Sequence, residues 1–160
     1  MQPLDLINDI VVFDMDGVLN KYDFGELGVK IMSEHEWVRA NMIVDMYSTY
    51  IEKTTLFDEL IEQKNPMDMY VLSTAFSSFE QNNKLNFLEQ AYPNIRPEHV
   101  MFVARDEFKV DILKELREVY DKEGKQDTRI IIIEDTVGIM ASVEELHNDK
   151  IKCYLISDFI

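Results

Sequence analysis

The chain has one cysteine, no long apolar stretch and no recognisable leader. Cys153 has no second cysteine to pair with, which excludes an internal disulfide and fits a reducing compartment. No apolar stretch approaches the ~18 residues that a membrane-spanning helix needs. The N-terminal sequence lacks the basic region and the cleavage site of a signal peptide. We therefore expect a soluble cytoplasmic domain with no membrane partner.

Basic residues are scarce relative to acidic ones. Sixteen Lys and Arg stand against 31 Asp and Glu, which gives a formal net charge of −15. A protein that binds DNA or RNA without sequence preference neutralises phosphates with Lys and Arg, so we expect no nucleic-acid polymer as a partner. A small phosphorylated ligand stays compatible with this charge, provided that a cation or a few positive groups line its pocket.

The length and the apolar content indicate one domain with its own core. A chain of 160 residues is too short for two ordinary domains. Its hydrophobic fraction of 46% argues against disorder. A chain of this size buries about two-thirds of its unfolded surface, so it needs neither a metal nor a disulfide to fold. We therefore treat residues 1–160 as a single domain, and no oligomeric state is predicted.

Five short apolar runs predict the strands of an open parallel sheet. They are continuous rather than alternating, which is typical of strands buried on both faces. Helical patterns separate the runs, which favours a Rossmann-like three-layer α/β/α sandwich of about five mostly parallel strands. The runs are Ile10 to Phe13, Met69 to Leu72, Val100 to Val103, Ile130 to Ile133 and Ile151 to Ile156.

The first connection is too long for one crossover helix. A crossover needs about a dozen residues, yet 55 residues separate Phe13 from Met69. The excess predicts a small helical lid at about residues 22–52. A capping box at Ser33 opens its main helix, whose apolar positions extend to Ile51. The other helices are expected after Thr55, after Ser78, over about 107–121 and after Thr136.

Polar side chains follow four of the five predicted strands. Ligands of such sheets bind beyond the carboxyl ends of the strands, so these side chains are candidates for a site. Taken singly, most have an ordinary explanation, because Asp-x-Asp-Gly often forms a turn and hydroxyl and acidic groups suit helix starts. An ammonium in the first turn of a helix is disfavoured by the helix dipole, so Lys109 indicates a nearby anion. The candidates are Asp14, Asp16, Gly17, Ser73, Thr74, Lys109, Glu134 and Asp135.

Clustered carboxylates indicate a bound cation. Asp14, Asp16 and Asp135 would repel each other at one edge of the sheet unless a cation joined them. Oxygen ligands with room for several waters are typical of Mg²⁺. A magnesium ion, an ammonium and a hydroxyl around a carboxylate nucleophile suit phosphoryl transfer, where catalysis is mostly positioning and charge neutralisation.

Four segments resemble the motifs of the haloacid dehalogenase-like superfamily, which is dominated by Mg²⁺-dependent phosphatases. VVFDMDGVLN resembles its motif I, and YVLST resembles motif II, a strand that ends in Ser or Thr. Lys109 fits motif III, and IIIIEDTVGIMAS resembles motif IV in the form found in phosphatases and sugar phosphomutases with helical caps. The resemblance covers the whole core in order, and it implies an α/β core with a small helical cap.

The resemblance implies roles for the acidic candidates. Asp14 would be the nucleophile that becomes an aspartyl phosphate. Asp16 would protonate the leaving oxygen and then, as a base, activate the hydrolytic water. The Asp14 carboxylate, the Asp16 backbone carbonyl and the Asp135 carboxylate would bind Mg²⁺, with Glu134 acting through a metal-bound water.

The remaining candidates would hold the phosphate. Ser73 would donate to a phosphoryl oxygen, with Thr74 as the alternative if the strand ends one residue later. Lys109 would balance the phosphoryl charge and steady the nucleophile; Lys114 competes for this role but points away from the strand end. Gly17 would contribute by giving the turn after the nucleophile its backbone freedom.

Asp16 also narrows the reaction class. Within the superfamily, ATPase pumps place Thr at that position and dehalogenases lack the acid, which leaves phosphatases and phosphomutases. A mutase normally holds its doubly phosphorylated intermediate with basic cap residues, and the insertion offers only Lys30 and Arg39. The hypothesis is a Mg²⁺-dependent phosphomonoester hydrolase acting on a small soluble metabolite. A sugar phosphomutase and a catalytically silent phospholigand-binding module are the alternatives.

The lid is rich in aromatic residues. Helical spacing explains most of them as lid core, but one or two facing the pocket would suit an apolar or aromatic leaving group. A nucleotide therefore stays open as a substrate. The aromatic residues of the lid and its surroundings are Tyr22, Phe24, Trp37, Tyr47, Tyr50 and Phe76.

Overall fold

Five parallel strands form the central sheet, in the order β5-β4-β1-β6-β7. The computed structural model describes residues 6–22 and 33–160. All five strands begin at the residues that the apolar runs predict, and the predicted three-layer α/β fold is confirmed. The strands are β1 (Ile10–Phe13), β4 (Met69–Thr74), β5 (Val100–Val103), β6 (Ile130–Glu134) and β7 (Ile151–Leu155).

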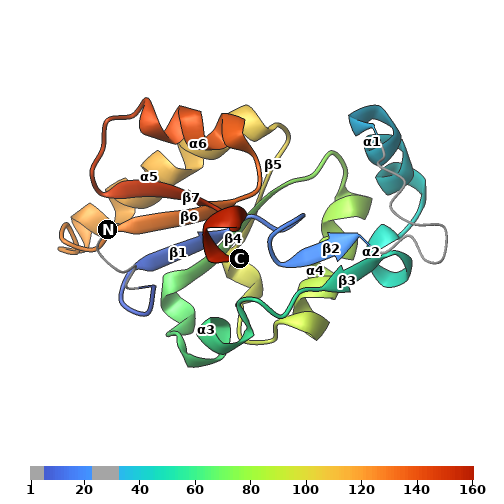
Figure 1. The fold of residues 1–160 in the computed structure, drawn as a ribbon, viewed down its shortest axis with the longest axis horizontal. Coiled ribbons are helices and arrows are strands. Elements are labelled where there is room, and N and C mark those ends of the chain that lie inside the picture. The colour runs from blue at the N-terminus through green and yellow to red at the C-terminus, as the bar shows by residue number, and fades with distance from the viewer. Residues whose placement is uncertain (1–5, 23–32) are drawn as a thin grey trace.

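Helices cover both faces of this sheet (Figure 1). Val11 and Phe13 belong to a core that includes side chains of the helices on one face, α3 and α4. Ile10 and Val12 belong to a second core shared with α5 and α6 on the other face. Alternate residues of one strand thus serve opposite faces, which is why the runs are apolar throughout. The helices are α3 (Asp58–Gln63), α4 (Ser78–Ala91), α5 (Lys109–Lys122) and α6 (Val137–Glu144).

The register of the sheet brings separate strand ends together. Phe13 of β1 pairs with Ile133 of β6, so the next residues, Asp14 and Glu134, lie at the same edge of the sheet. β4 lies on the other side of β1 and ends at Thr74. The ends of β4, β1 and β6, which carry polar side chains, therefore lie next to one another because the strands themselves are neighbours in the sheet.

The segment between β1 and β4 corrects one prediction. The expected helix to Ile51 is wrong: α1 (Glu34–Ile43) ends, α2 (Met46–Thr49) is a separate turn, and Ile51 starts a strand. The break has a local cause, because the Asp45 side chain accepts from two backbone N–H groups and caps a new helix. The strand β3 (Ile51–Lys53) pairs antiparallel with β2 (Asn20–Tyr22), so the insertion holds a ribbon as well as helices.

The start of α3 is a smaller correction. Thr55 was predicted to open this helix, but the helix begins at Asp58 after Phe57, whose side chain is buried against Phe13. Phe24 and Lys30 lie outside the described residues. Residues 6–22 and 33–160 also contain four short 3-10 helices: η2 (Pro66–Asp68), η3 (Pro97–His99), η4 (Asp106–Phe108) and η5 (Ile156–Phe159).

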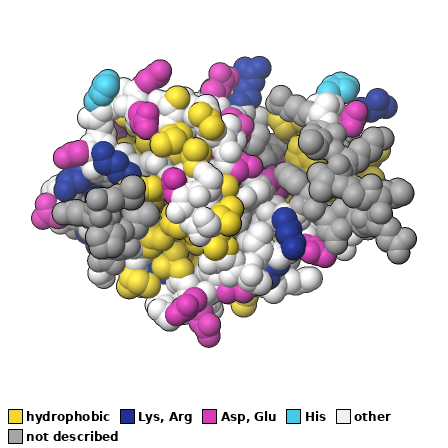
Figure 2. Space-filling view, viewed as in Figure 1, with side chains coloured by type: hydrophobic (Ala, Val, Ile, Leu, Met, Phe, Trp, Pro, Cys, Tyr) yellow, Lys and Arg dark blue, Asp and Glu magenta, His cyan; other side chains and the backbone are white. Residues whose placement is uncertain are grey.

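The surface reflects the acidic composition. Figure 2 shows acidic side chains scattered over one face, with hydrophobic side chains gathered near its middle. Among the described residues, no helix combines the length and the apolar character that crossing a membrane requires.

Candidate active site

The predicted site residues meet around one cavity at the carboxyl edge of the sheet. The cavity has a volume of about 260 Å³. Its walls come from the ends of β1, β4 and β6, from the start of α5 and from α1. Six of the eight predicted candidates line it: Asp14, Asp16, Ser73, Thr74, Lys109 and Asp135. Gly17 and Glu134 lie directly behind this lining.

Lys109 joins two of the strand ends. Its ammonium, with only 2% of the residue exposed, donates to Asp14 Oδ1 at 3.0 Å and to Glu134 Oε1 at 2.6 Å. Burial alone would lower the pKa of Lys109, but the Asp14 and Glu134 carboxylates outweigh it and raise that pKa. Lys109 is therefore charged in the folded protein. Lys114, the alternative considered above, is exposed on α5.

Asp14 is almost buried, with 6% exposed. Its carboxylate accepts, within the described part of the chain, from Met15 N at 2.8 Å and from Lys109 Nζ at 3.0 Å, and both bonds reach Oδ1. Burial raises the pKa of Asp14 well above its ordinary value, Lys109 opposes this, and the neighbouring carboxylates raise it further. The second oxygen, Oδ2, thus belongs to an acidic group that would gain from a cation nearby.

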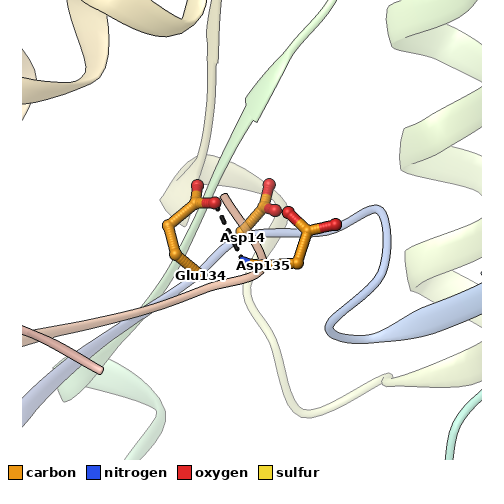
Figure 3. Close-up of side chains that lie close together, drawn as sticks. All are labelled: Asp14, Glu134 and Asp135. Carbon is orange, nitrogen blue, oxygen red and sulfur yellow. Dashed lines mark hydrogen bonds between the residues drawn. The ribbon is translucent and has the colours of Figure 1, made fainter. Parts of the chain in front are cut away.

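Three carboxylates converge at this point. Ligand atoms of Asp14, Glu134 and Asp135 lie within 4.8 Å of one another. Figure 3 shows the three side chains grouped where β1 and β6 end. Asp14 and Glu134 are buried, whereas Asp135 is exposed. Such oxygen donors are the type that Mg²⁺ prefers, and an ion there would offset repulsion that one ammonium only partly cancels.

Glu134 is the most enclosed of the three. Its Oε1 accepts from Lys109, and its Oε2 accepts from the backbone N–H groups of Asp135 and Thr136 at 3.1 and 3.3 Å. Burial raises the pKa of Glu134, and Lys109 opposes that shift. Because both of its oxygens already accept from the protein, Glu134 fits a supporting role, in contact with a metal through water, better than direct ligation.

The Asp16 carboxylate is held from three elements. Lys84 on α4 donates to Oδ2 at 3.0 Å. Tyr47 on α2 donates to Oδ1 at 2.7 Å, and Asn20 on β2 donates to the same oxygen at 3.2 Å. The side chain lines the cavity. The insertion and the core therefore both fix this carboxylate beside Asp14.

The two hydroxyls at the end of β4 have different partners. Ser73 Oγ accepts from Lys84 at 2.8 Å, so the hydroxyl hydrogen of Ser73 remains available to a ligand in the cavity. The Thr74 hydroxyl instead donates to Asp106. The hydrogen-bonding pattern therefore favours Ser73 over Thr74 as the donor to a bound anion.

Gly17 shapes the site without lining it. Its N–H donates to Asn20 Oδ1, at 3.3 Å, rather than into the cavity. Its φ is +83°, and a Cβ on it would lie 2.3 Å from Asp135 Oδ2. Only glycine lets the turn after Asp14 come this close to the carboxylate of the neighbouring strand end. Its contribution is to the backbone, as the turn argument predicts.

Sequence reasoning missed Lys84 and the hydroxyl of Tyr47. The sequence patterns predict no role for Lys84, and helical spacing places Tyr47 in the lid core. A signal for Lys84 exists: Glu80, Lys84 and Leu88 lie four residues apart on one stripe of α4, and Leu88 is an apolar, buried member of that stripe. A lysine on a buried stripe needs a partner, which the topology supplies.

A second cavity of about 640 Å³ adjoins the first. Both cavities are lined by Val38, Thr74, Phe76 and Asp106. The outer one adds the mixed polar side chains of His35, Arg105 and Glu107. The two cavities together form a longer cleft, in which the apolar side chains of Trp37, Val38 and Phe76 lie beside the polar ones.

Comparison of the chain with protein-family models and with curated proteins finds no match.

Proposed function

We propose that this protein is a Mg²⁺-dependent phosphomonoester hydrolase that transfers the phosphoryl group first to Asp14 and then to water. The observation that carries the proposal is the arrangement around one cavity of a buried carboxylate, an ammonium bonded to it, a free hydroxyl hydrogen and a second fixed carboxylate. Three of the four segments that resemble haloacid dehalogenase-like motifs supply these groups, and the fourth supplies the carboxylates of Glu134 and Asp135 beside them.

In this proposal, Asp14 attacks phosphorus and the bond to the leaving oxygen breaks. Asp14 Oδ2 is the attacking atom, because the hydrogen bonds of this carboxylate within the described residues reach Oδ1. Lys109 and the Ser73 hydroxyl stabilise the negative charge on the phosphoryl oxygens. Asp16 gives a proton to the leaving oxygen, and in the second step it takes a proton from the water that hydrolyses the aspartyl phosphate.

The donor set fits Mg²⁺. The carboxylates of Asp14 and Asp135 and the backbone carbonyl of Asp16 would hold it, and Glu134 would contact it through a bound water. When bound, the ion neutralises charge on the phosphoryl group as it transfers. Asp135, the exposed member of the cluster, is then the residue whose loss affects metal binding with least effect on the core.

The adjoining cavity would receive the leaving group. Val38 and Phe76 provide apolar surface there, and Asp106 and Arg105 provide charges of both signs. This lining suits an organic leaving group with an apolar part and polar edges, as in a small phosphorylated metabolite. A nucleotide fits this description and stays open as a substrate.

Release of inorganic phosphate tests the proposal. EDTA-treated protein would be assayed on p-nitrophenyl phosphate and on a panel of nucleotides, sugar phosphates and phosphorylated acids, with and without Mg²⁺. We expect Mg²⁺-dependent release, abolished in Asp14→Asn. No turnover on any compound would contradict the proposal and favour a binding module. Isomerisation without net phosphate release would favour a mutase.

A further inference from the structure

Lys84 is an unusual lysine. It lies in the middle of α4 with 0% of its surface exposed. A buried ammonium loses its hydration, so it is tolerated only where protein oxygens replace the lost water. Lys84 Nζ donates to Asp16 Oδ2 at 3.0 Å, to Ser73 Oγ at 2.8 Å and to the Thr74 carbonyl oxygen at 2.6 Å.

A second carboxylate balances its charge. Glu80, one helical turn earlier and 2% exposed, places Oε2 3.4 Å from Lys84 Nζ. Its other oxygen accepts from the Phe76 backbone N–H at 3.0 Å. Glu80 is itself bonded to the loop that follows β4, so it holds the Lys84 ammonium in a fixed position.

Another buried lysine shows what is specific about this one. Lys64 is 2% exposed, but it donates to the backbone carbonyl oxygens of Leu6, Ile7 and Asp9. Those contacts fasten the chain that leads into β1. Lys84 instead gives two of its three protons to side chains that line the candidate active site.

We infer that Lys84 is a positioning residue that holds the Asp16 carboxylate and the Ser73 hydroxyl at fixed places beside Asp14. This inference rests on the proposed function. Tyr47 and Asn20 hold Oδ1 of Asp16, and Lys84 holds Oδ2, so the carboxylate cannot rotate. By filling an acceptor site of Ser73 Oγ, Lys84 also directs the hydroxyl hydrogen toward the cavity. One ammonium thus fixes both the general acid, Asp16, and the hydroxyl of Ser73 that donates a hydrogen bond to the phosphoryl group.

Loss of this alignment would slow turnover without abolishing it. A reacting group displaced by about 1 Å can cost about 10²-fold in rate, so we expect Lys84→Met to lower kcat by about 10- to 100-fold. KM should change less than kcat, since Lys109 still binds the phosphate. Lys84→Met alone would leave Glu80 buried and unpaired, so the variant is made in a Glu80→Gln background, in which the amide oxygen can still accept from Phe76.

A double-mutant cycle separates positioning from a general effect on folding. In the Glu80→Gln background, kcat is measured for Lys84→Met, for Asp16→Asn and for both together on p-nitrophenyl phosphate. If Lys84 acts largely through Asp16, Lys84→Met costs less than about fivefold once Asp16 is Asn. Equal costs with and without Asp16, or an unchanged kcat in Lys84→Met, would overturn the inference.

Lys64→Met is the matched control. It removes a similarly buried ammonium that donates to the carbonyl oxygens of Leu6, Ile7 and Asp9, none of which lines the cavity, so it should lower Tm while kcat stays within about twofold. A fall in kcat like that of Lys84→Met would attribute both effects to destabilisation and overturn the inference. If the wild-type protein releases no phosphate from any substrate, that result contradicts the proposed function, and the inference with it.

Discussion

Replacing Asp135 with Asn should separate the metal site from the fold. Asp135 is exposed, and its ligand atoms lie within 4.8 Å of those of Asp14 and Glu134. The amide of Asn fits the same space, and its oxygen can still accept from the Thr136 hydroxyl, which now lies 3.1 Å from Asp135 Oδ1. The substitution therefore removes one charge from the cluster and little else.

The structure sets the size of the effect. Two unit charges 4.8 Å apart repel by about 1 kcal/mol in bulk water and by about 3.5 kcal/mol at an effective dielectric constant of 20. The exposure of Asp135 favours the lower end of this range, and Lys109 offsets part of it. Without metal, Asp135→Asn should therefore match or exceed the wild type in Tm, by no more than a few degrees at about 2–4 °C per kcal/mol.

With added Mg²⁺, the Tm of the wild type should exceed that of Asp135→Asn. Saturation to about 100 times Kd stabilises a binding protein by about 2.7 kcal/mol, so the Tm of the wild type should rise by about 5–11 °C. Asp135→Asn should shift much less at the same concentration. Differential scanning calorimetry after EDTA treatment, with MgCl₂ titrated back, measures both effects.

The control is Asp127→Asn, which removes an exposed carboxylate from the loop before β6. It should keep the full Mg²⁺ shift. Equal Mg²⁺-dependent shifts in Asp135→Asn and the wild type would refute the assignment of the site.

Three further predictions concern residues in this cluster or beside it. Burial raises the pKa of Asp14 in the metal-free fold, so stability is lost as pH rises above about 4, the ordinary pKa of an aspartate, toward the raised value. Asp14→Asn should therefore raise the metal-free Tm by an amount that grows as pH rises above about 4, and a difference that does not change with pH would count against this. Gly17→Ala should lose both activity and the Mg²⁺-dependent shift in Tm, because its Cβ would meet the Asp135 carboxylate. The control is Gly124→Ala, where φ is +80° but the surrounding space is open, and it should show only a stability cost of about 1–2 kcal/mol. Equal activities of the two variants would contradict the close approach. Tyr47→Phe keeps the ring contacts with Trp37 and Phe87 but loses the hydroxyl that donates to Asp16, so kcat should fall by about 10-fold. The control is Tyr50→Phe, at an exposed position, and its kcat should not change. A wild-type kcat in Tyr47→Phe would disprove a role for the hydroxyl.

The sheet was predictable because helices cover both of its faces. Ile10 to Phe13 and Ile130 to Ile133 are fully buried, so both faces of these strands must be apolar and the runs are continuous. Strand ends then follow from the pattern, and with them Asp14, Ser73 and Glu134. The carboxyl ends of parallel strands share one edge, so their convergence follows from topology alone.

The insertion was not predictable in the same way. β2 and β3 have three residues each, and their pairing depends on the partner strand rather than on a pattern within either. Val44 and Asp45 break the helix through backbone conformation and a side-chain cap, although the apolar spacing continues past them.

Lys84 and Tyr47 were missed for a related reason. Both lie on helices whose sequence patterns describe one buried face, and each side chain extends from that face to a carboxylate on another element. A lysine near an apolar stripe is compatible with a solvated side chain until the fold places Asp16 in front of it. The partner is set by tertiary structure, which a local pattern does not contain.

The measurement closest to the central claim is the mass of the protein during turnover. An activated aryl phosphate needs little help from an acid, so Asp16→Asn should still phosphorylate Asp14 but hydrolyse the intermediate slowly. Rapid-quench mass spectrometry should then show a gain of about 80 Da, one phosphoryl group, on the peptide that contains Asp14. Asp14→Asn should show no gain. A phosphoryl group on any other residue, or full activity in Asp14→Asn, would contradict the mechanism.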